Sequence, residues 1–386
     1  MKRVSIVMAI VLCLAQAQWL ETTIFLPDTM TGLADSRAIV FDSSQKRVYV
    51  GGNSGYVMAI DHERSEKLVR IPVPNGAVAM CLDETAGRIY CAGGQMSQDS
   101  VLTVIDVATN SVVGAVRVGP MPYILAIAPD RTIYCGNGYG RSVSIIRNDT
   151  VAATLSLGLT PTIIRPIPGT GKTYCAAGIT SGSSIFVIEG DTIRDSIGIA
   201  RSPRDIVYCP ANGHAYVPSG FEAGIYVIDV AADSVIAVIR LDTTATAAAY
   251  DADRDKLYCG LAGGRLSIID CATNTVLKTM TLPATPGLVI SDTSLDRVYC
   301  SGAGNAGISV IDCQEDSLVH DIAMPSVPQA MRAVPGFLYA ACPSPVCLVS
   351  VAVPADTIQA RLVFGYGPMA FAYNSQQNRI YVAEYL

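Results

Sequence analysis

The chain has 386 residues, of which 50% are hydrophobic and 16% are charged, and its formal net charge is −6. An acidic chain without a basic stripe is poorly suited to nucleic acid or to anionic membrane surfaces, so we expect neither as a partner. The high apolar content indicates strands that are covered on both faces.

The first 17 residues predict a cleaved secretory signal. Lys2 and Arg3 precede the apolar run 4–14, and small residues follow at positions 15 and 17. The run is too short to cross a bilayer, although a membrane anchor is an alternative. Cleavage would leave 25 Lys and Arg against 33 Asp and Glu, a net charge of −8. We therefore expect residues 18–386 to form one domain that is secreted, periplasmic or at the cell surface, with no membrane span.

Tyrosines recur along the chain at intervals of 40–44 residues. A period near 40 with several short strands in each unit is typical of a β-propeller. Eight full units fit between the first and the last tyrosine, so eight blades are preferred, and seven or nine remain possible. The repeated tyrosines are Tyr49, Tyr90, Tyr134, Tyr174, Tyr216, Tyr258, Tyr299, Tyr339 and Tyr381.

The second unit shows the expected blade most clearly. Apolar segments at 76–83, 88–94, 101–106 and 111–119 are separated by turn residues. Short strands divided in this way predict antiparallel hairpins, and hence a four-stranded blade. The third segment ends with an aspartate, Asp106, as it does in other units at Asp229, Asp270 and Asp312, and this carboxylate can accept a backbone N–H and start the next turn.

The ends of the chain carry unpaired repeat segments. Residues 20–26 look like a fourth strand, and residues 367–386 look like a first and a second strand. We expect these extra strands to pair at the seam of an eight-bladed ring. The alternative is that the gene product is truncated and lacks a further C-terminal segment.

Twelve cysteines in an exported protein suggest disulfides, but their positions favour buried thiols. Five of them directly follow a repeat tyrosine, in a slot that elsewhere holds valine or alanine, and a buried Cys behaves as a small apolar residue. Equivalent slots in different blades are expected to lie too far apart to bridge. The best disulfide candidate is Cys342 with Cys347, which face each other across a short Pro-rich turn.

The repeat pattern resembles the YVTN family of β-propeller repeats, within the wider propeller superfamily of the quinoprotein amine dehydrogenases. The segments that carry the resemblance are 49–52 (YVGG), 309–312 (SVID), 274–283 (NTVLKTMTLP) and 111–122 (SVVGAVRVGPMP). The resemblance covers about residues 19–386. It implies a shared blade design found in exported and surface-layer proteins of several roles.

No catalytic, metal-binding or cofactor-attaching constellation is recognisable. His62, His214 and His320 occupy three different places in their units, which argues against a shared metal. Motifs for haem attachment, nucleophilic serine and phosphate binding are absent. The acidic run 251–255 (DADRD) lacks the glycine and the distal glutamate of a calcium loop, so it indicates a solvated turn.

Arg37 and Arg204 each lie 12 residues before their repeat tyrosine. This position leads into the innermost strand, so both are predicted at one mouth of the central channel. Propellers commonly bind ligands there, and two arginines could hold a carboxylate or a phosphate. The alternative is that both are ordinary surface residues on connectors.

These features favour an exported, non-enzymatic scaffold that binds a protein or glycan partner, or contributes to the cell surface, without a cofactor. The alternative is a propeller enzyme of the lactonase or hydrolase type with its active site at a channel mouth. A third hypothesis is a redox role like that of the quinoprotein dehydrogenases, although no cofactor motif supports it.

Overall fold

The computed structural model describes residues 36–384 apart from 65, 95–98, 179–182, 200–201, 304–306, 344–345, 354, 364–367 and 375–378. For residues 303, 368–374 and 379–384 it describes the backbone alone. The predicted signal 1–17 and the predicted strand 20–26 lie outside the described residues.

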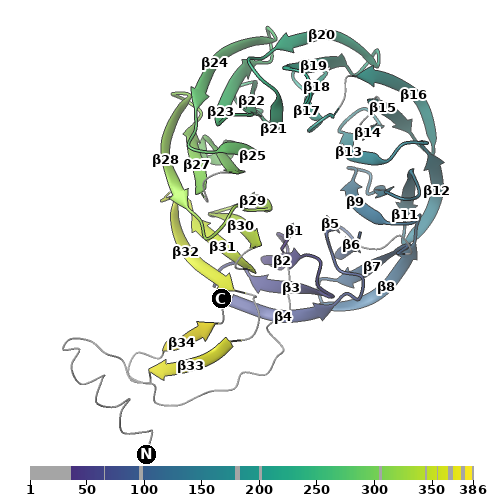
Figure 1. Ribbon diagram of the computed structural model, residues 1–386. Coiled ribbons are helices and arrows are strands. Elements are labelled where there is room, and N and C mark those ends of the chain that lie inside the picture. The colour runs from purple at the N-terminus through teal and green to yellow at the C-terminus, as the bar shows by residue number, and fades with distance from the viewer. Residues whose placement is uncertain are drawn as a thin grey trace, which may run out of the picture.

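Eight four-stranded antiparallel sheets stand in a ring, and the fold is an eight-bladed β-propeller (Figure 1). The predicted all-β propeller with eight four-stranded repeats is therefore confirmed. In every blade the strands pair in chain order, with the first strand at the centre of the ring and the fourth at its rim. We number the blades 1 to 8 along the chain, and name the turns by the strands that they join.

The first four blades follow one another without exchange of strands. Blade 1 holds β1 (Ala38–Asp42), β2 (Arg47–Gly51), β3 (Tyr56–Asp61) and β4 (Glu66–Pro72). Blade 2 holds β5 (Ala79–Asp83), β6 (Arg88–Ala92), β7 (Val101–Asp106) and β8 (Ser111–Arg117). Blade 3 holds β9 (Pro122–Ile127), β10 (Ile133–Asn137), β11 (Ser142–Arg147) and β12 (Thr150–Ser156). Blade 4 holds β13 (Pro161–Ile167), β14 (Lys172–Ala177), β15 (Ser183–Glu189) and β16 (Thr192–Ile199).

The second half of the ring repeats the same design. Blade 5 holds β17 (Val207–Cys209), β18 (His214–Pro218), β19 (Gly224–Asp229) and β20 (Ser234–Arg240). Blade 6 holds β21 (Ala245–Asp251), β22 (Lys256–Leu261), β23 (Arg265–Asp270) and β24 (Thr275–Thr281). Blade 7 holds β25 (Thr285–Asp292), the short 3-10 helix η2 (Thr293–Leu295), β26 (Arg297–Ala303), β27 (Gly307–Asp312) and β28 (Ser317–Ala323). Blade 8 holds β29 (Ala330–Val334), β30 (Phe337–Pro343), β31 (Val346–Ala352) and β32 (Thr357–Val363).

The last two strands, β33 (Pro368–Asn374) and β34 (Arg379–Glu384), form a separate two-stranded sheet. Figure 1 shows this hairpin outside the ring. The prediction that these strands pair at the seam is therefore wrong. Blades 1 and 8 already contain four strands from their own units, so no strand position in the ring is left for β33 or β34.

The second and third strands are buried on both faces because each blade is covered by two neighbours. The apolar alternation of β2, β6 and the equivalent strands places each repeat tyrosine towards one neighbouring blade and its apolar neighbours towards the other. Among the largest fully buried side chains are the rings of Tyr49, Tyr174, Tyr216, Tyr258, Tyr299 and Tyr339. Burial of such a side chain contributes about 1.5–3 kcal/mol before conformational entropy is subtracted.

The hydroxyl of a repeat tyrosine reaches the next blade. Six of these hydroxyls bond to an Asn or Asp that stands just before the fourth strand of the following blade, with a positive φ that Asn and Asp tolerate better than most residues. The pairs are Tyr49–Asn110 (2.8 Å), Tyr90–Asp149 (2.5 Å), Tyr174–Asp233 (2.6 Å), Tyr216–Asn274 (2.7 Å), Tyr258–Asp316 (3.0 Å) and Tyr299–Asp356 (3.4 Å).

Blade 8 closes on blade 1 through a variant of this contact. Tyr339 donates its hydroxyl to the carbonyl of His62 at 3.1 Å, and the same hydroxyl lies 3.0 Å from His62 Nδ1. The imidazole also packs against Phe41 and Phe337, with ring centroids 4.9 and 5.1 Å away. An aromatic cluster therefore joins the first and last blades. The ring closes there without a strand from one end of the chain entering the blade at the other end.

The aspartates that end the third strands start the 3–4 turns, as predicted. Asp106 Oδ1 accepts the backbone N–H of Thr109 at 2.9 Å, and Asp229 Oδ1 accepts those of Ala232 at 3.1 Å and Ala231 at 2.8 Å. These bonds hold the pKa of both carboxyls below the usual value. The carboxylates therefore have a structural role in the turns.

Candidate functional site

A cavity of about 570 Å³ lies between the innermost strands of blades 4 to 8. Pro168 and Pro210, which follow the ends of β13 and β17, line it, so it lies towards the end of the channel where the 1–2 turns are. Its volume falls in the range of small-molecule sites. Because the first strands supply its walls, it is part of the channel that Figure 1 views end on.

The cavity contains two arginines with different surroundings. Arg165 of β13 donates from Nη2 to Asp205 Oδ1 at 2.5 Å and from Nε to the carbonyl of Ile206 at 3.1 Å. Arg332 of β29 is exposed, and no hydrogen bond or ion pair joins its guanidinium to another described residue. One cation is therefore neutralised within the protein, and the other is available to an anion.

The remaining wall of the cavity is largely apolar. Val207, Ala248, Val289 and Met331 contribute aliphatic surface, and the half-buried Tyr208 adds an aromatic ring. A cation beside an apolar wall suits a ligand with a carboxylate on a less polar body, because the wall excludes water from the ion pair.

The two arginines predicted at a channel mouth do not line this cavity. Arg37 immediately precedes β1 and Arg204 precedes β17, so both lie at the opposite end of the first strands. Blades 1 and 5 are four places apart in a ring of eight, which puts the two residues on opposite sides of the channel. The guanidinium of Arg204 packs against Gly220 in its own blade. Their joint binding of one anion stays a prediction.

The predicted partners Cys342 and Cys347 are brought together. They are direct cross-strand neighbours in the β30–β31 hairpin, and both are buried. Both are free thiols in this structure. The thiol of Cys347 and burial raise the pKa of Cys342. The disulfide itself therefore stays a prediction, with the required neighbour relation in place.

A second cavity, of about 340 Å³, lies between blades 2 and 3. It is lined by three arginines and three aspartates. Arg131 Nε lies 2.9 Å from Asp83 Oδ2 within the lining, and Arg147 Nη1 lies 2.7 Å from Oδ1 of Asp191, which is outside it. Because acidic and basic residues are equal in number, this cavity favours an anion less than the channel does.

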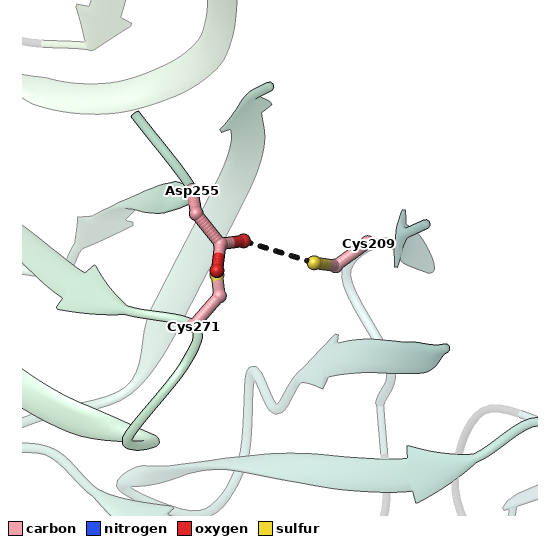
Figure 2. A group of neighbouring side chains, drawn as sticks. All are labelled: Cys209, Asp255 and Cys271. Atoms are coloured by element: carbon pink, nitrogen blue, oxygen red, sulfur yellow. Dashed lines mark hydrogen bonds between the residues drawn. The ribbon is translucent and has the colours of Figure 1, made fainter. Parts of the chain in front are cut away.

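A third candidate lies between blades 5 and 6, where Cys209, Asp255 and Cys271 converge (Figure 2). One donor atom from each lies within 4.8 Å of the other two. Cys209 Sγ donates to Asp255 Oδ1 at 3.1 Å, and Tyr250 Oη donates to the same oxygen at 2.9 Å. Among the described residues, this is the one group of three His, Cys, Asp or Glu side chains close enough to share a metal ion.

Sequence reasoning missed this cluster. The run 251–255 was interpreted as a solvated turn, which is wrong for Asp251, because its side chain is fully buried. Asp255 is half-buried, and its φ of 51° turns the side chain back towards the neighbouring blade. Cys209 and Cys271 do not directly follow a repeat tyrosine, and this difference from the five cysteines that do was the feature of the sequence that could have indicated the cluster.

Comparisons with known proteins support the fold. No protein-family model and no curated protein matches the chain. A solved structure of the dihydro-heme d1 dehydrogenase NirN in complex with DHE is similar, with 15% identity and a TM-score of 0.67, over 89% of this chain and 75% of that one. Hydrazine synthase from Kuenenia stuttgartiensis is similar with 15% identity and a TM-score of 0.54, over 77% of this chain and 99% of that one. At these identities the likeness concerns the propeller alone.

In the part of the chain that is described, no helix has the length and apolar character needed to cross a bilayer.

Proposed function

We propose that this protein is an exported, non-enzymatic β-propeller of the YVTN-repeat type that binds a carboxylate-bearing protein or glycan partner in its channel. The observation that carries the proposal is Arg332, a cation in the channel cavity without a hydrogen bond or ion pair to any described residue. In a protein of net charge −6, such a cation gives the cavity local affinity for an anion.

The lining of the cavity favours binding over catalysis. A hydrolase would need convergent acid, base or metal-ligating groups in reach of one substrate atom. The acidic residue of the lining is Asp205, and its carboxylate is already bonded to Arg165. Arg332 can bind and orient an anion there, and apart from Arg165, Asp205 and Tyr208 the lining supplies no further ionisable side chain.

The redox chemistry named for NirN is not carried over to this chain. Haem iron is commonly held by histidine, and the three histidines here lie elsewhere. His62 is at the seam of the ring, His214 begins β18, and His320 is in the rim strand β28. None of them lines the channel cavity.

Titration with defined probes tests the proposal. We would measure the affinity of a uronate oligosaccharide and of a glutamate-rich peptide, each beside its uncharged amide counterpart. We expect at least one charged probe to bind and both amides to bind weakly. Loss of a charge-assisted bond of about 1.5–3 kcal/mol in Arg332→Ala should weaken binding by at least tenfold.

Arg117→Ala is the matched control, because Arg117 is an exposed arginine on the rim strand β8, far from the channel. This variant should bind as the wild type does. Equal affinities for Arg332→Ala and the wild type would contradict the proposed site. Turnover of a lactone or ester that is lost in Arg332→Ala would instead support the enzyme alternative.

A further inference from the structure

We propose that Cys209, Asp255 and Cys271 form a binding site for a thiol-preferring divalent cation, with zinc as the expected metal, between blades 5 and 6. The site is separate from the channel. Cys209 ends β17 in blade 5, Asp255 stands in the 1–2 turn of blade 6, and Cys271 directly follows β23 in blade 6. A metal there would join two blades by coordination.

The donor atoms are close to the geometry that zinc requires. A tetrahedral zinc ion with Zn–S bonds of about 2.3 Å separates its ligand atoms by about 3.8 Å. The three donors already lie within 4.8 Å of one another, and Figure 2 shows Cys209 and Asp255 directed towards each other with Cys271 beside Asp255. Small side-chain movements of less than about 1 Å would complete the site. Both thiols are fully buried, and the half-buried Asp255 provides access from the surface.

The next interface, between blades 6 and 7, has the same three positions but already contains a cation. There the positions hold Asp251, Asp296 and Cys313, and in both interfaces the cysteine N–H donates to the turn aspartate's carbonyl at 3.0 Å. Arg254 places Nη1 2.7 Å from Asp296 Oδ1 and 3.5 Å from Asp251 Oδ2. A guanidinium therefore neutralises the carboxylates at that interface.

Blade 5 has Asn212 where blade 6 has Arg254, three residues after the end of the first strand. The Asn212 amide donates to the Cys271 carbonyl at 2.7 Å, and it carries no charge. The Asp255 carboxylate consequently has no cationic partner among the described residues, and its side-chain bonds come from Tyr250 and Cys209. A metal ion would supply the positive charge that Arg254 supplies next door.

The donor set selects the class of metal. Two sulfurs and one carboxylate oxygen suit zinc and similar soft or borderline cations, and they do not suit calcium or magnesium, which prefer oxygen ligands. A water molecule that enters beside Asp255 can complete the coordination. Tyr250, bonded to Asp255, is a positioning residue that orients the carboxylate.

Binding couples to proton release. Burial raises the pKa of both thiols above the usual value, so both are protonated in the metal-free protein at neutral pH. Each thiol loses its proton to solvent as its sulfur bonds to the cation, so one Zn²⁺ displaces two H⁺. Affinity should therefore increase as the pH rises.

The test uses the full chain, reduced and treated with a chelator, and titrated with Co²⁺ as a spectroscopic probe and then with Zn²⁺. We expect one Co²⁺ per chain with thiolate-to-cobalt charge-transfer absorption, displaced by Zn²⁺ with release of two protons. Cys209→Ser and Cys271→Ser should lose this absorption. Tyr250→Phe should lower zinc affinity by about 10–100-fold. Cys313→Ser is the matched control at the next interface and should bind as the wild type does.

A measurement on the wild type keeps the proposal testable if a serine variant fails to fold. Zinc should protect Cys209 and Cys271 from alkylation, as read by peptide mass mapping, and should leave the labelling of Cys313 unchanged. Absence of stoichiometric binding by the reduced protein would overturn the proposal, as would binding that persists in Cys209→Ser. The proposal would also be overturned if Cys209 and Cys271 formed a disulfide and the reduced protein bound no metal.

Discussion

The hydroxyl of Tyr174 in blade 4 lies 2.6 Å from Oδ1 of Asp233, which stands in the 3–4 turn of blade 5. The other carboxylate oxygen of Asp233 accepts Lys172 Nζ at 2.7 Å. Lys256, Tyr258 and Asp316 repeat this arrangement between blades 6 and 7. A polar contact of a repeat tyrosine with an Asn or Asp thus lies at the edge of six apolar interfaces, where it links one blade to the next.

Removal of the Tyr174 hydroxyl measures this contact. Tyr174→Phe keeps the buried ring and leaves Asp233 bonded to Lys172 alone. Because the lost bond is to a charged acceptor, we expect the free energy of unfolding to fall by about 1.5–3 kcal/mol in urea denaturation. Tyr139→Phe is the control, since Tyr139 is 67% exposed and should change stability little. Equal losses in the two variants would contradict a specific role for the contact.

The seam between blades 8 and 1 should be sensitive to acid. Burial holds the pKa of His62 below its usual value of 6.5. The unfolded chain therefore binds a proton at a higher pH than the folded ring does. The stabilising contribution is complete above about pH 6.5, and it is lost as the pH falls from there towards the folded-state pKa.

We expect the melting temperature of the wild type to decrease over this window. His62→Gln should remove that part of the pH dependence, although it lowers stability at neutral pH. The comparison is a set of thermal melts from pH 7.5 to pH 5. A His62→Gln profile that runs parallel to the wild type would show that the seam does not titrate.

Gly302 at the end of β26 is predicted to tolerate no side chain. A Cβ there would lie 1.9 Å from the carbonyl oxygen of Thr285, which is backbone and cannot move aside alone. We expect Gly302→Ala to lower the unfolding free energy by at least about 1–3 kcal/mol. Gly114→Ala in the rim strand β8 is the matched control, because nothing lies within 4 Å of its Cβ position. The measurement is the free energy of unfolding of both variants by chemical denaturation. Equal values for Gly302→Ala and Gly114→Ala would contradict the steric argument.

Cys342 and Cys347 should form a disulfide under mild oxidation, since they are neighbours across one hairpin. Non-reducing peptide mass mapping should find this bond. Cys259 and Cys300, each buried in its own blade, should remain thiols. Recovery of both Cys342 and Cys347 as alkylated thiols after oxidation and unfolding would show that the hairpin does not allow the bond geometry.

Much of the blade could be predicted from the sequence because its interactions are local. The predicted segments 76–83 and 88–94 correspond to β5 (Ala79–Asp83) and β6 (Arg88–Ala92). Hairpins with short turns leave little choice of register, and the apolar alternation indicates which faces are covered. The turn role of Asp106 followed from the same local chemistry.

The candidate sites were much less predictable. No feature of the sequence distinguishes Arg332 from the other arginines. The ring of blades places it in one cavity with Arg165 and Asp205. Cys209 is at the end of β17 in blade 5, and Asp255 is in a turn of blade 6 with a positive φ. The two residues meet only because the two blades pack against each other. Neither relation leaves a local pattern in the chain.

The forty-residue repeat of tyrosine strands was enough to predict a propeller of four-stranded blades with eight blades preferred, because hydrogen bonding within a blade joins neighbouring segments. The structure settled the count at eight. The ring decided which blades face each other, how the seam closes through Tyr339 and His62, and where Arg332 and the Cys209–Asp255–Cys271 cluster lie. Those contacts join residues far apart in the chain, for example 46 positions between Cys209 and Asp255 and 277 between His62 and Tyr339. Apolar packing of neighbouring blades brings Cys209 to Asp255, and closure of the ring brings His62 to Tyr339.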